Sequence, residues 1–271
     1  MTQEFEVTPP AEAPVQQSLS AVERSFPVWS AWDILFLVAF SSFSMLMLAA
    51  LGEAVKHLVQ TQLPAMRWLL LGHEGVYLIL FQALLDLLVL LFVYFTIRLK
   101  CNAPFLESIK WRPRDRIEAR YYLLVGIGLA LAVVAASAVM PSPSPPPIEK
   151  LLNVPLTAFL FAVLGVLVAP FVEEIIFRGF IYPVVERWLG RAAAIAATAL
   201  LFSSVHVGQL WGSWPAIVLI TVVGFTLSVT RARTDALLPS FVIHLAYNST
   251  ICLLFLVGVL VEGFPRPVPT P

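Results

Sequence analysis

The sequence predicts an all-α membrane protein, a polytopic helix bundle with seven transmembrane spans and possibly an eighth. Hydrophobic residues make up 59% of the 271 residues and charged residues only 13%, and the mean hydropathy is +0.87. Soluble globular domains carry about 25% charged residues. The apolar residues are also gathered into long blocks, which favours membrane spans over one large soluble core.

Seven of these blocks are long enough, or nearly so, to cross a hydrocarbon core of about 30 Å as helices. The lipid bilayer is therefore the first expected partner. The blocks are residues 32–51, 76–97, 121–140, 155–185, 192–207, 214–229 and 238–261. A shorter apolar segment, 63–71, fits an interfacial or re-entrant helix and would make the eighth span.

The blocks divide the chain into five parts. Residues 1–27 are polar and acidic and predict a disordered tail. Residues 28–140 form a transmembrane scaffold of ordinary hydrophobicity, and the Pro-rich residues 141–149 predict a stiff linker. Residues 150–262 carry nearly all the polar side chains inside apolar blocks and form the expected catalytic core, followed by a tail at 263–271.

Lys and Arg in the loops predict the orientation. Loops 98–120, 187–191 and 231–237 are basic, whereas the alternate loops after residue 140 carry only Lys150 and Arg266. The first loop, with Lys56 and Arg67, disagrees with this pattern. By the positive-inside rule the basic loops are cytoplasmic. We therefore expect a multi-pass protein of the plasma (inner) membrane, with its N-terminus inside.

Composition also excludes some functions. The formal net charge is zero, which leaves no basic surface for a nucleic-acid partner. Cys101 and Cys252 lie in different blocks and form neither a disulfide framework nor a C-x-x-C zinc motif. The cysteines therefore indicate no metal site of that type, and no cofactor is expected.

Two carboxylates and a guanidinium interrupt the fourth apolar block. Glu174 and Arg178 stand at i and i+4, so they can pair on one helix face. Glu173 is rotated by about 100° from Glu174 and points at another neighbour. Pro170 allows a kink just before the pair. A charge inside a bilayer is unfavourable by at least about 2.5 kcal/mol and usually has a function there.

Three further polar residues fall inside later blocks: His206, and His244 with Asn248 at i, i+4. Glu173 and His206 lie at equal distances along the chain from a turn near Leu189 and Gly190. As antiparallel neighbours they would reach one level, roughly 20 to 25 Å from the turn. His244 and Asn248 enter from the same side and reach a comparable depth.

Each of these features has a structural reading when taken alone. A buried Glu–Arg pair can simply fix helix register, and a lone histidine in a span is more often a hydrogen-bonded packing residue. Together, however, the side chains supply a base, an orienting imidazole and two hydrogen-bond donors. That set can activate a water and hold the oxyanion that forms on a carbonyl. Asp33, near the interface, and Asp86, which could pair within the bundle, have no assigned role.

The three motifs resemble a known family. Glu173-Glu174-Ile-Ile-Phe-Arg178, Phe202-Ser-Ser-Val-His206 and His244-Leu-Ala-Tyr-Asn248 stand in separate spans, in the order found in the CPBP family of intramembrane glutamic endopeptidases. That family includes type II CAAX prenyl endopeptidases and bacteriocin-processing or self-immunity proteins. The similarity covers about residues 150–260.

The resemblance implies hydrolysis of a peptide bond by a glutamate-activated water, without an obligatory metal. Glu173 would be the general base, and His206 would help to position the water. His244 and Asn248 would stabilise the oxyanion, while Glu174 and Arg178 would hold the site together. The implied substrate is a membrane-associated or prenylated peptide.

Three alternatives remain open. The same polar cluster could bind a peptide or partner without catalysis, as in an immunity or accessory protein. It could also serve a proton-coupled carrier, since intramembrane Glu and His act in proton relays. Finally, Glu173, His206 and His244 could bind zinc in a metal-dependent form of the hydrolysis.

Overall fold

The computed structural model of the chain describes residues 26–63, 74–112, 116–140, 142 and 146–263, and these contain helices and no strand. The all-α prediction is therefore confirmed for the part of the chain described. The helices are α2 (Ala31–Thr61), α3 (Glu74–Lys100), α4 (Phe105–Ser108), α5 (Arg116–Val139), α6 (Glu149–Leu152), α7 (Pro155–Val163), η2 (Leu164–Val168), α8 (Ala169–Glu174), η3 (Ile175–Ile181), α9 (Tyr182–His206), α10 (Trp214–Thr234) and α11 (Leu238–Glu262).

Six helical stretches of the described residues are long and apolar enough to cross a membrane, as expected for a multi-pass protein. They are Ala31–Thr61, Glu74–Lys100, Ala119–Val139, Pro155–His206, Trp214–Thr234 and Leu238–Val261. The fourth stretch has 52 residues, which the sequence analysis divides into two spans. The count of seven therefore stays a prediction. The possible eighth segment, 63–71, lies outside the described residues from residue 64 onward.

The 52-residue stretch is not one straight rod. Gly190 has φ 81° and ψ 170°, a conformation that glycine adopts without steric strain. On either side of it, Glu173 Oε1 and His206 Nε2 lie 3.8 Å apart. A straight helix would separate these two residues by about 50 Å. The chain therefore folds back at Gly190, where the sequence predicts a turn.

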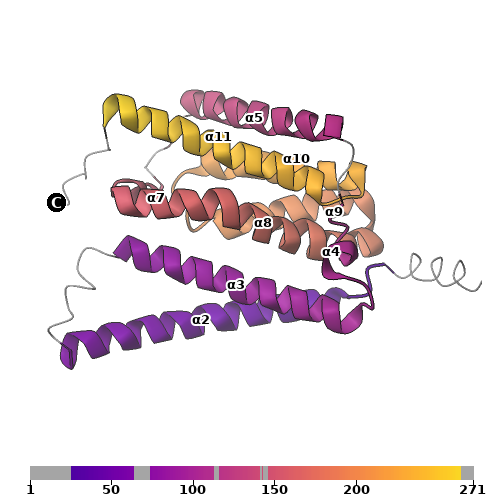
Figure 1. The fold of residues 1–271 in the computed structure, drawn as a ribbon, viewed down its shortest axis with the longest axis horizontal. Helices are drawn as coiled ribbons and strands as arrows, with labels where there is room; N and C mark the ends of the chain where they lie inside the picture. Colours follow the sequence, from indigo (N-terminus) through magenta and orange to yellow (C-terminus); the bar gives the residue numbers. More distant parts are fainter. Residues whose placement is uncertain (1–25, 64–73, 113–115, 141, 143–145, 264–271) are drawn as a thin grey trace, which may run out of the picture.

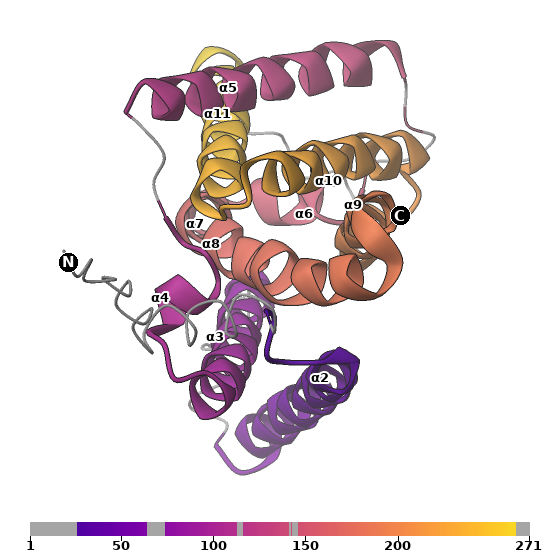
Figure 2. The same cartoon turned by 90° about the vertical axis from the view of Figure 1, so that its right-hand side faces the viewer.

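The helices of the predicted scaffold flank the predicted core on two sides. In both views α2 and α3 lie on one side, α5 lies on the other, and α7 to α11 lie between them (Figures 1 and 2). Helix α9 packs along α10, and α5 packs along α11. The last contact is tight, because a Cβ atom on Gly126 would lie 2.4 Å from the Ile243 carbonyl oxygen. The domain boundaries drawn from the sequence stay a prediction.

The helix that carries the two glutamates departs from α geometry on either side of them. Segments η2 and η3 are π-helical and bracket the six residues of α8. One of these π-helical segments, η2, ends two residues before Pro170, and the kink expected at Pro170 stays a prediction. Single π-helical turns inside α-helices are frequent at functional sites.

The 101–112 segment, which connects α3 to the chain before α5, docks on the core. Ile109 is fully buried and packs where Gly179 leaves room, because a Cβ atom on Gly179 would lie 3.5 Å from the Ile109 Cβ atom. The Leu237 amide donates to the Lys110 carbonyl at 3.0 Å. A basic loop in the sequence is therefore, in part, a packed structural element.

Trp111, in the same segment, packs against two of the helices that carry the site. Its ring centroid lies 5.4 Å from that of Phe171 and 5.0 Å from that of Phe241. Phe171 precedes Glu173 by two residues, and Phe241 precedes His244 by three. The contact therefore braces α8 and α11 within about one turn of the predicted site.

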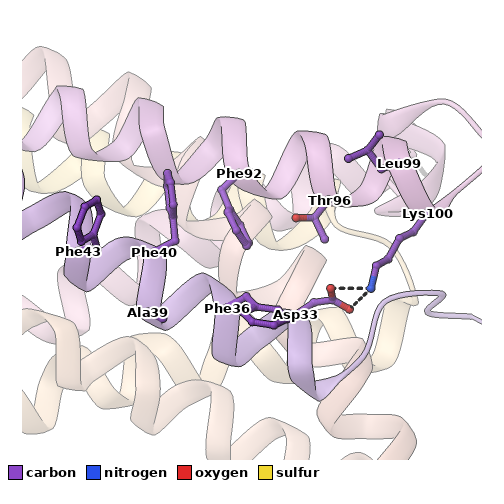
Figure 3. A pocket seen from close by; sticks show the side chains of 9 residues that line it. All are labelled: Asp33, Phe36, Ala39, Phe40, Phe43, Phe92, Thr96, Leu99 and Lys100. Atoms are coloured by element: carbon purple, nitrogen blue, oxygen red, sulfur yellow. Dashed lines mark hydrogen bonds and ion pairs between the residues drawn. The ribbon is translucent and has the colours of Figure 1, made fainter.

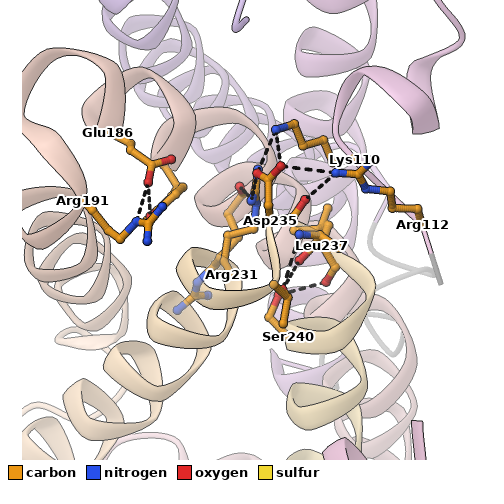
Figure 4. Close-up of polar contacts among 12 residues, drawn as sticks. Lys110, Arg112, Glu186, Arg191, Arg231, Asp235, Leu237 and Ser240 are labelled. Atoms are coloured by element: carbon orange, nitrogen blue, oxygen red, sulfur yellow. Dashed lines mark hydrogen bonds and ion pairs between the residues drawn. The ribbon is translucent and has the colours of Figure 1, made fainter. Parts of the chain in front are cut away.

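Asp235 ties this segment to the end of α10 (Figure 4). Its carboxylate accepts hydrogen bonds from Lys110 Nζ at 2.7 Å, from Arg112 Nη2 at 3.2 Å and from Arg231 Nη1 at 3.1 Å. Partial burial acts to raise the pKa of Asp235. The bonds from Lys110 and Arg231 outweigh burial and hold that pKa below its ordinary value of 3.8.

A groove of about 510 Å³ lies between α2 and α3 (Figure 3). Its walls are mostly apolar and include Phe36, Phe40 and Phe92. At one end, Lys100 Nζ bonds both carboxylate oxygens of Asp33 at 2.7 Å. Asp33, which had no role from the sequence, thus pairs the two helices near their ends.

Candidate active site

Glu174 and Arg178 form an ion pair inside the bundle. Arg178 Nη1 donates to Glu174 Oε1 at 3.0 Å, and both side chains are 0% exposed. Their i, i+4 spacing places them on one face even though Arg178 lies in the π-helical segment η3. A buried pair of this kind is strongly destabilised when one partner is removed, because the other charge is left uncompensated.

His244 reaches both glutamates. Its Nδ1 atom lies 3.2 Å from Glu174 Oε1, and its Nε2 atom lies 3.6 Å from Glu173 Oε2. The side chain is only 3% exposed. Since the ionised Glu174 can only accept, the bond at 3.2 Å assigns a hydrogen to Nδ1. The Nε2 atom is then the one that faces Glu173.

His206 approaches Glu173 from the other side. Its Nδ1 atom donates to the Phe202 carbonyl at 2.7 Å, since a carbonyl can only accept. In the neutral ring Nε2 is therefore an acceptor, and it lies 3.8 Å from Glu173 Oε1. The Glu173 carboxylate thus stands between two imidazoles, one facing each oxygen.

This spacing suits a bridging water. Neither separation from Glu173 is a direct hydrogen bond, since both exceed 3.5 Å. Two acceptors that share one water stand about 4 Å apart, close to the observed separation of 3.8 Å between Glu173 and His206. The side chains of Glu173 and His206 are 23% and 17% exposed, so a small molecule can reach them. A water held by both of its hydrogens keeps its lone pairs free for attack.

Asn248 makes a different contact. Its Nδ2 atom donates to the Gly165 carbonyl at 2.7 Å. Within the described part of the chain, no hydrogen bond joins Asn248 to Glu173, His206 or His244. The amide has a second N–H, so the bond to Gly165 does not by itself remove the predicted role.

The sequence analysis missed three contacts around Arg178. Its Nη2 atom donates to the Gly224 carbonyl at 2.9 Å, its guanidinium lies 4.5 Å from the Phe202 ring centroid, and its own carbonyl accepts from Arg231 Nε at 3.2 Å. From the sequence, Arg231 was counted only as a cation of a basic loop. The i, i+4 spacing between Arg231 and Asp235 could have indicated that Arg231 is held in place by an ion pair.

The contact at Gly224 could have been suspected from the sequence, because a glycine inside an apolar block often marks a close approach of two helices. A Cβ atom there would lie 2.9 Å from Phe202 Cδ1 and 3.2 Å from the Ala199 carbonyl oxygen. A residue with no side chain therefore lets α10 approach α9 closely enough for the Gly224 carbonyl to meet Arg178.

Asp86 is a third acid close to the site. It lies in α3, which packs against α7, α8 and η3. Gln82 Nε2 donates to Asp86 Oδ1 at 2.7 Å, and no cation of the described residues pairs with it. The expected pairing within the bundle is thus a hydrogen bond to an amide on the same helix.

The described side chains do not form a metal-binding group. Within the ranges that the structure describes, no three side chains of His, Cys, Asp or Glu form a group that could hold a metal ion. Glu173, His206 and His244, which were considered as zinc ligands, are therefore not arranged as such a group.

Comparison with known families gives a match over the part of the chain that carries this site. Residues 155–250 match a family model described as type II CAAX prenyl endopeptidase Rce1-like. Searches of curated proteins and of solved structures give no match. The matched range contains all six residues that the sequence analysis assigns to the site, and it excludes α2, α3 and α5.

Proposed function

Because residues 155–250 belong to the Rce1-like family of type II CAAX prenyl endopeptidases, we propose that this multi-pass membrane protein is an intramembrane glutamic endopeptidase. It hydrolyses a peptide bond of a membrane-associated or lipidated substrate, in the plasma (inner) membrane. The observation that carries the proposal is the Glu173 carboxylate, with one oxygen 3.8 Å from His206 Nε2 and the other 3.6 Å from His244 Nε2.

The proposed mechanism places a hydrogen on His244 Nε2 as well as on Nδ1. If Glu173 were ionised and His244 neutral, two lone pairs would face each other at 3.6 Å. When the proton is on His244, Glu173 is a free carboxylate and His244 Nε2 is a donor. This form supplies both a general base and an electrophilic group, the combination that acyl transfer to water needs.

Hydrolysis then follows in two steps. Glu173 takes a proton from the water held with His206 as the water oxygen bonds to the carbonyl carbon, which gives a tetrahedral oxyanion. His244 Nε2–H donates to that oxyanion, and the second N–H of Asn248 is the other proposed donor. The C–N bond breaks as the oxyanion collapses, and Glu173 returns the proton to the leaving nitrogen. The products are a carboxylic acid and an amine.

Glu174 and Arg178 support these groups without touching the substrate. Glu174 Oε1 accepts from both Arg178 and His244, so it fixes the imidazole with Nε2 toward Glu173. Arg178 in turn is held by the Gly224 carbonyl. A chain of buried contacts from α10 through η3 and α8 to α11 therefore sets the orientation of the donor.

Replacement of Glu173 by Gln tests the base directly. The purified protein in lipid nanodiscs would be given a peptide library in which each member occurs with and without a prenyl group. We expect kcat to fall by about 10² to 10⁴ in Glu173→Gln, because an amide cannot take the proton. Glu53→Gln, the same change at a side chain that is 76% exposed, should leave kcat unchanged.

The outcomes separate the alternatives. Undiminished turnover in Glu173→Gln would remove the base role. Activity that a strong chelator abolishes and zinc restores would favour the metal-dependent scheme. A wild-type protein that retains peptides but cleaves none would support a binding or accessory protein. Cleavage of the prenylated members alone would identify the lipid as part of the substrate.

A further inference from the structure

The backbone of η2 leaves one carbonyl without a partner in its own helix. The Ala169 amide donates to the Leu164 carbonyl, five residues earlier, in the π-helical pattern. The next donor in this ladder would be residue 170, and its acceptor would be the Gly165 carbonyl. Residue 170 is proline and has no N–H. The Gly165 carbonyl therefore cannot be satisfied by the ladder.

Asn248 supplies the missing bond. Its Nδ2 atom, on α11, donates to the Gly165 carbonyl at 2.7 Å. Inside a bilayer, backbone groups that a proline frees find partners on neighbouring helices, because an unpaired carbonyl there has no water to bond with. The side chain of Asn248 thus takes the place of the amide hydrogen that Pro170 lacks.

This bond links η2 to the helix that carries His244. Asn248 and His244 are one turn apart on the same face of α11. One residue holds η2, immediately before α8, and the other contacts Glu173 and Glu174 at the end of α8. Because η2 leads directly into α8, the shape of η2 affects where the Glu173 carboxylate lies between His206 and His244.

We propose that Asn248 is a positioning residue, which holds the π-helical segment η2 before Pro170 and so aims Glu173 at the water. The effect on turnover rests on the proposed function, whereas the effect on η2 does not. The bond to Gly165 uses one N–H of the amide, and the proposal concerns that bond.

A double-mutant cycle tests this directly. Pro170→Ala restores a backbone N–H next to the Gly165 carbonyl, so it should make Asn248 less necessary. We expect Asn248→Ala to lower kcat about tenfold or more when residue 170 is proline. In the Pro170→Ala background the same change should lower kcat by less than about threefold. The KM value should change little in either case, because the group that moves is the base.

Thermal unfolding of the four proteins in detergent gives a second readout that needs no turnover. The shift caused by Asn248→Ala should be smaller in the Pro170→Ala background. If Pro170→Ala is inactive by itself, or if no substrate is cleaved by any variant, this cycle alone decides. Equal losses of thermal stability from Asn248→Ala in both backgrounds overturn the positioning role. Equal losses of kcat, with stabilities that are coupled, also overturn it and assign the catalytic effect to an oxyanion contact.

Discussion

Replacement of Glu174 should separate charge balance inside the bundle from catalysis. Glu174 and Arg178 are fully buried, and Glu174 Oε1 accepts from Arg178 at 3.0 Å and from His244 at 3.2 Å. Glu174→Ala leaves the guanidinium without its carboxylate, which should lower the free energy of unfolding by about 3–5 kcal/mol. Glu174→Gln keeps an acceptor oxygen and loses the charge, so we expect a smaller loss of about 1–3 kcal/mol.

A double variant provides the matched control. Glu174→Leu combined with Arg178→Met removes both charges, and exchange of a buried ion pair for apolar side chains is often close to neutral. We expect its free energy of unfolding to lie within about 1 kcal/mol of wild type. Its peptidase activity should still be lost, because His244 Nδ1 no longer has the acceptor that orients the ring.

The assay is unfolding in mixed detergent and SDS micelles, followed by circular dichroism, with turnover of a lipidated peptide measured on the same samples. Glu174→Ala within about 1 kcal/mol of wild type would refute the account of the buried pair. So would a double variant as unstable as the single one, because an uncompensated charge could not then explain the loss.

Two further perturbations test the packing of α5 on α11 and the ion pairs of Asp235. Gly126→Ala should destabilise the protein by about 1–3 kcal/mol, since the new Cβ atom would lie 2.4 Å from the Ile243 carbonyl oxygen and 2.6 Å from Ala246 Cβ. Gly128→Ala, where no atom lies within 4 Å of the new Cβ, should leave the stability unchanged when both variants are compared by thermal unfolding in detergent. Equal losses of stability in the two variants would contradict the close approach of α5 to α11. The depressed pKa of Asp235 stabilises the fold at neutral pH, and this stabilisation is lost as the pH falls below the ordinary value of 3.8. Asp235→Asn should therefore be less stable than wild type at neutral pH by about 1 kcal/mol or less, because the side chain is half exposed, and the two should converge in acid. A difference that persists below the folded-state pKa would count against the ion pairs.

Local spacing made part of the site predictable. The i, i+4 relation between Glu174 and Arg178 follows from helix geometry alone, so their contact could be expected without knowledge of the fold. The meeting of Glu173 with His206 needed one more fact, a turn near Gly190. Counting residues from that turn then gives equal depth on two antiparallel helices, and the two side chains lie at one level in the structure.

Contacts between distant helices could not be read in this way. Membrane helices are apolar on all sides, so hydrophobic periodicity does not show which face meets which neighbour. Nothing in the sequence shows that His244 would reach both glutamates or that Arg178 would meet Gly224. The hydrogen bond from Asn248 to the Gly165 carbonyl could not be predicted either, because it depends on a π-helical hydrogen-bond pattern that sequence spacing does not reveal.

The 101–112 segment has a consequence for how much of the chain makes a working enzyme. Ile109 and Trp111 lie outside the residues that match the family model. Nevertheless, Ile109 packs beside Gly179. The Trp111 ring packs against the rings of Phe171 and Phe241. A fragment restricted to 150–262 would keep every residue proposed for catalysis and lose these contacts. We therefore expect a split protein to regain turnover only when the fragment that contains Trp111 is supplied as well.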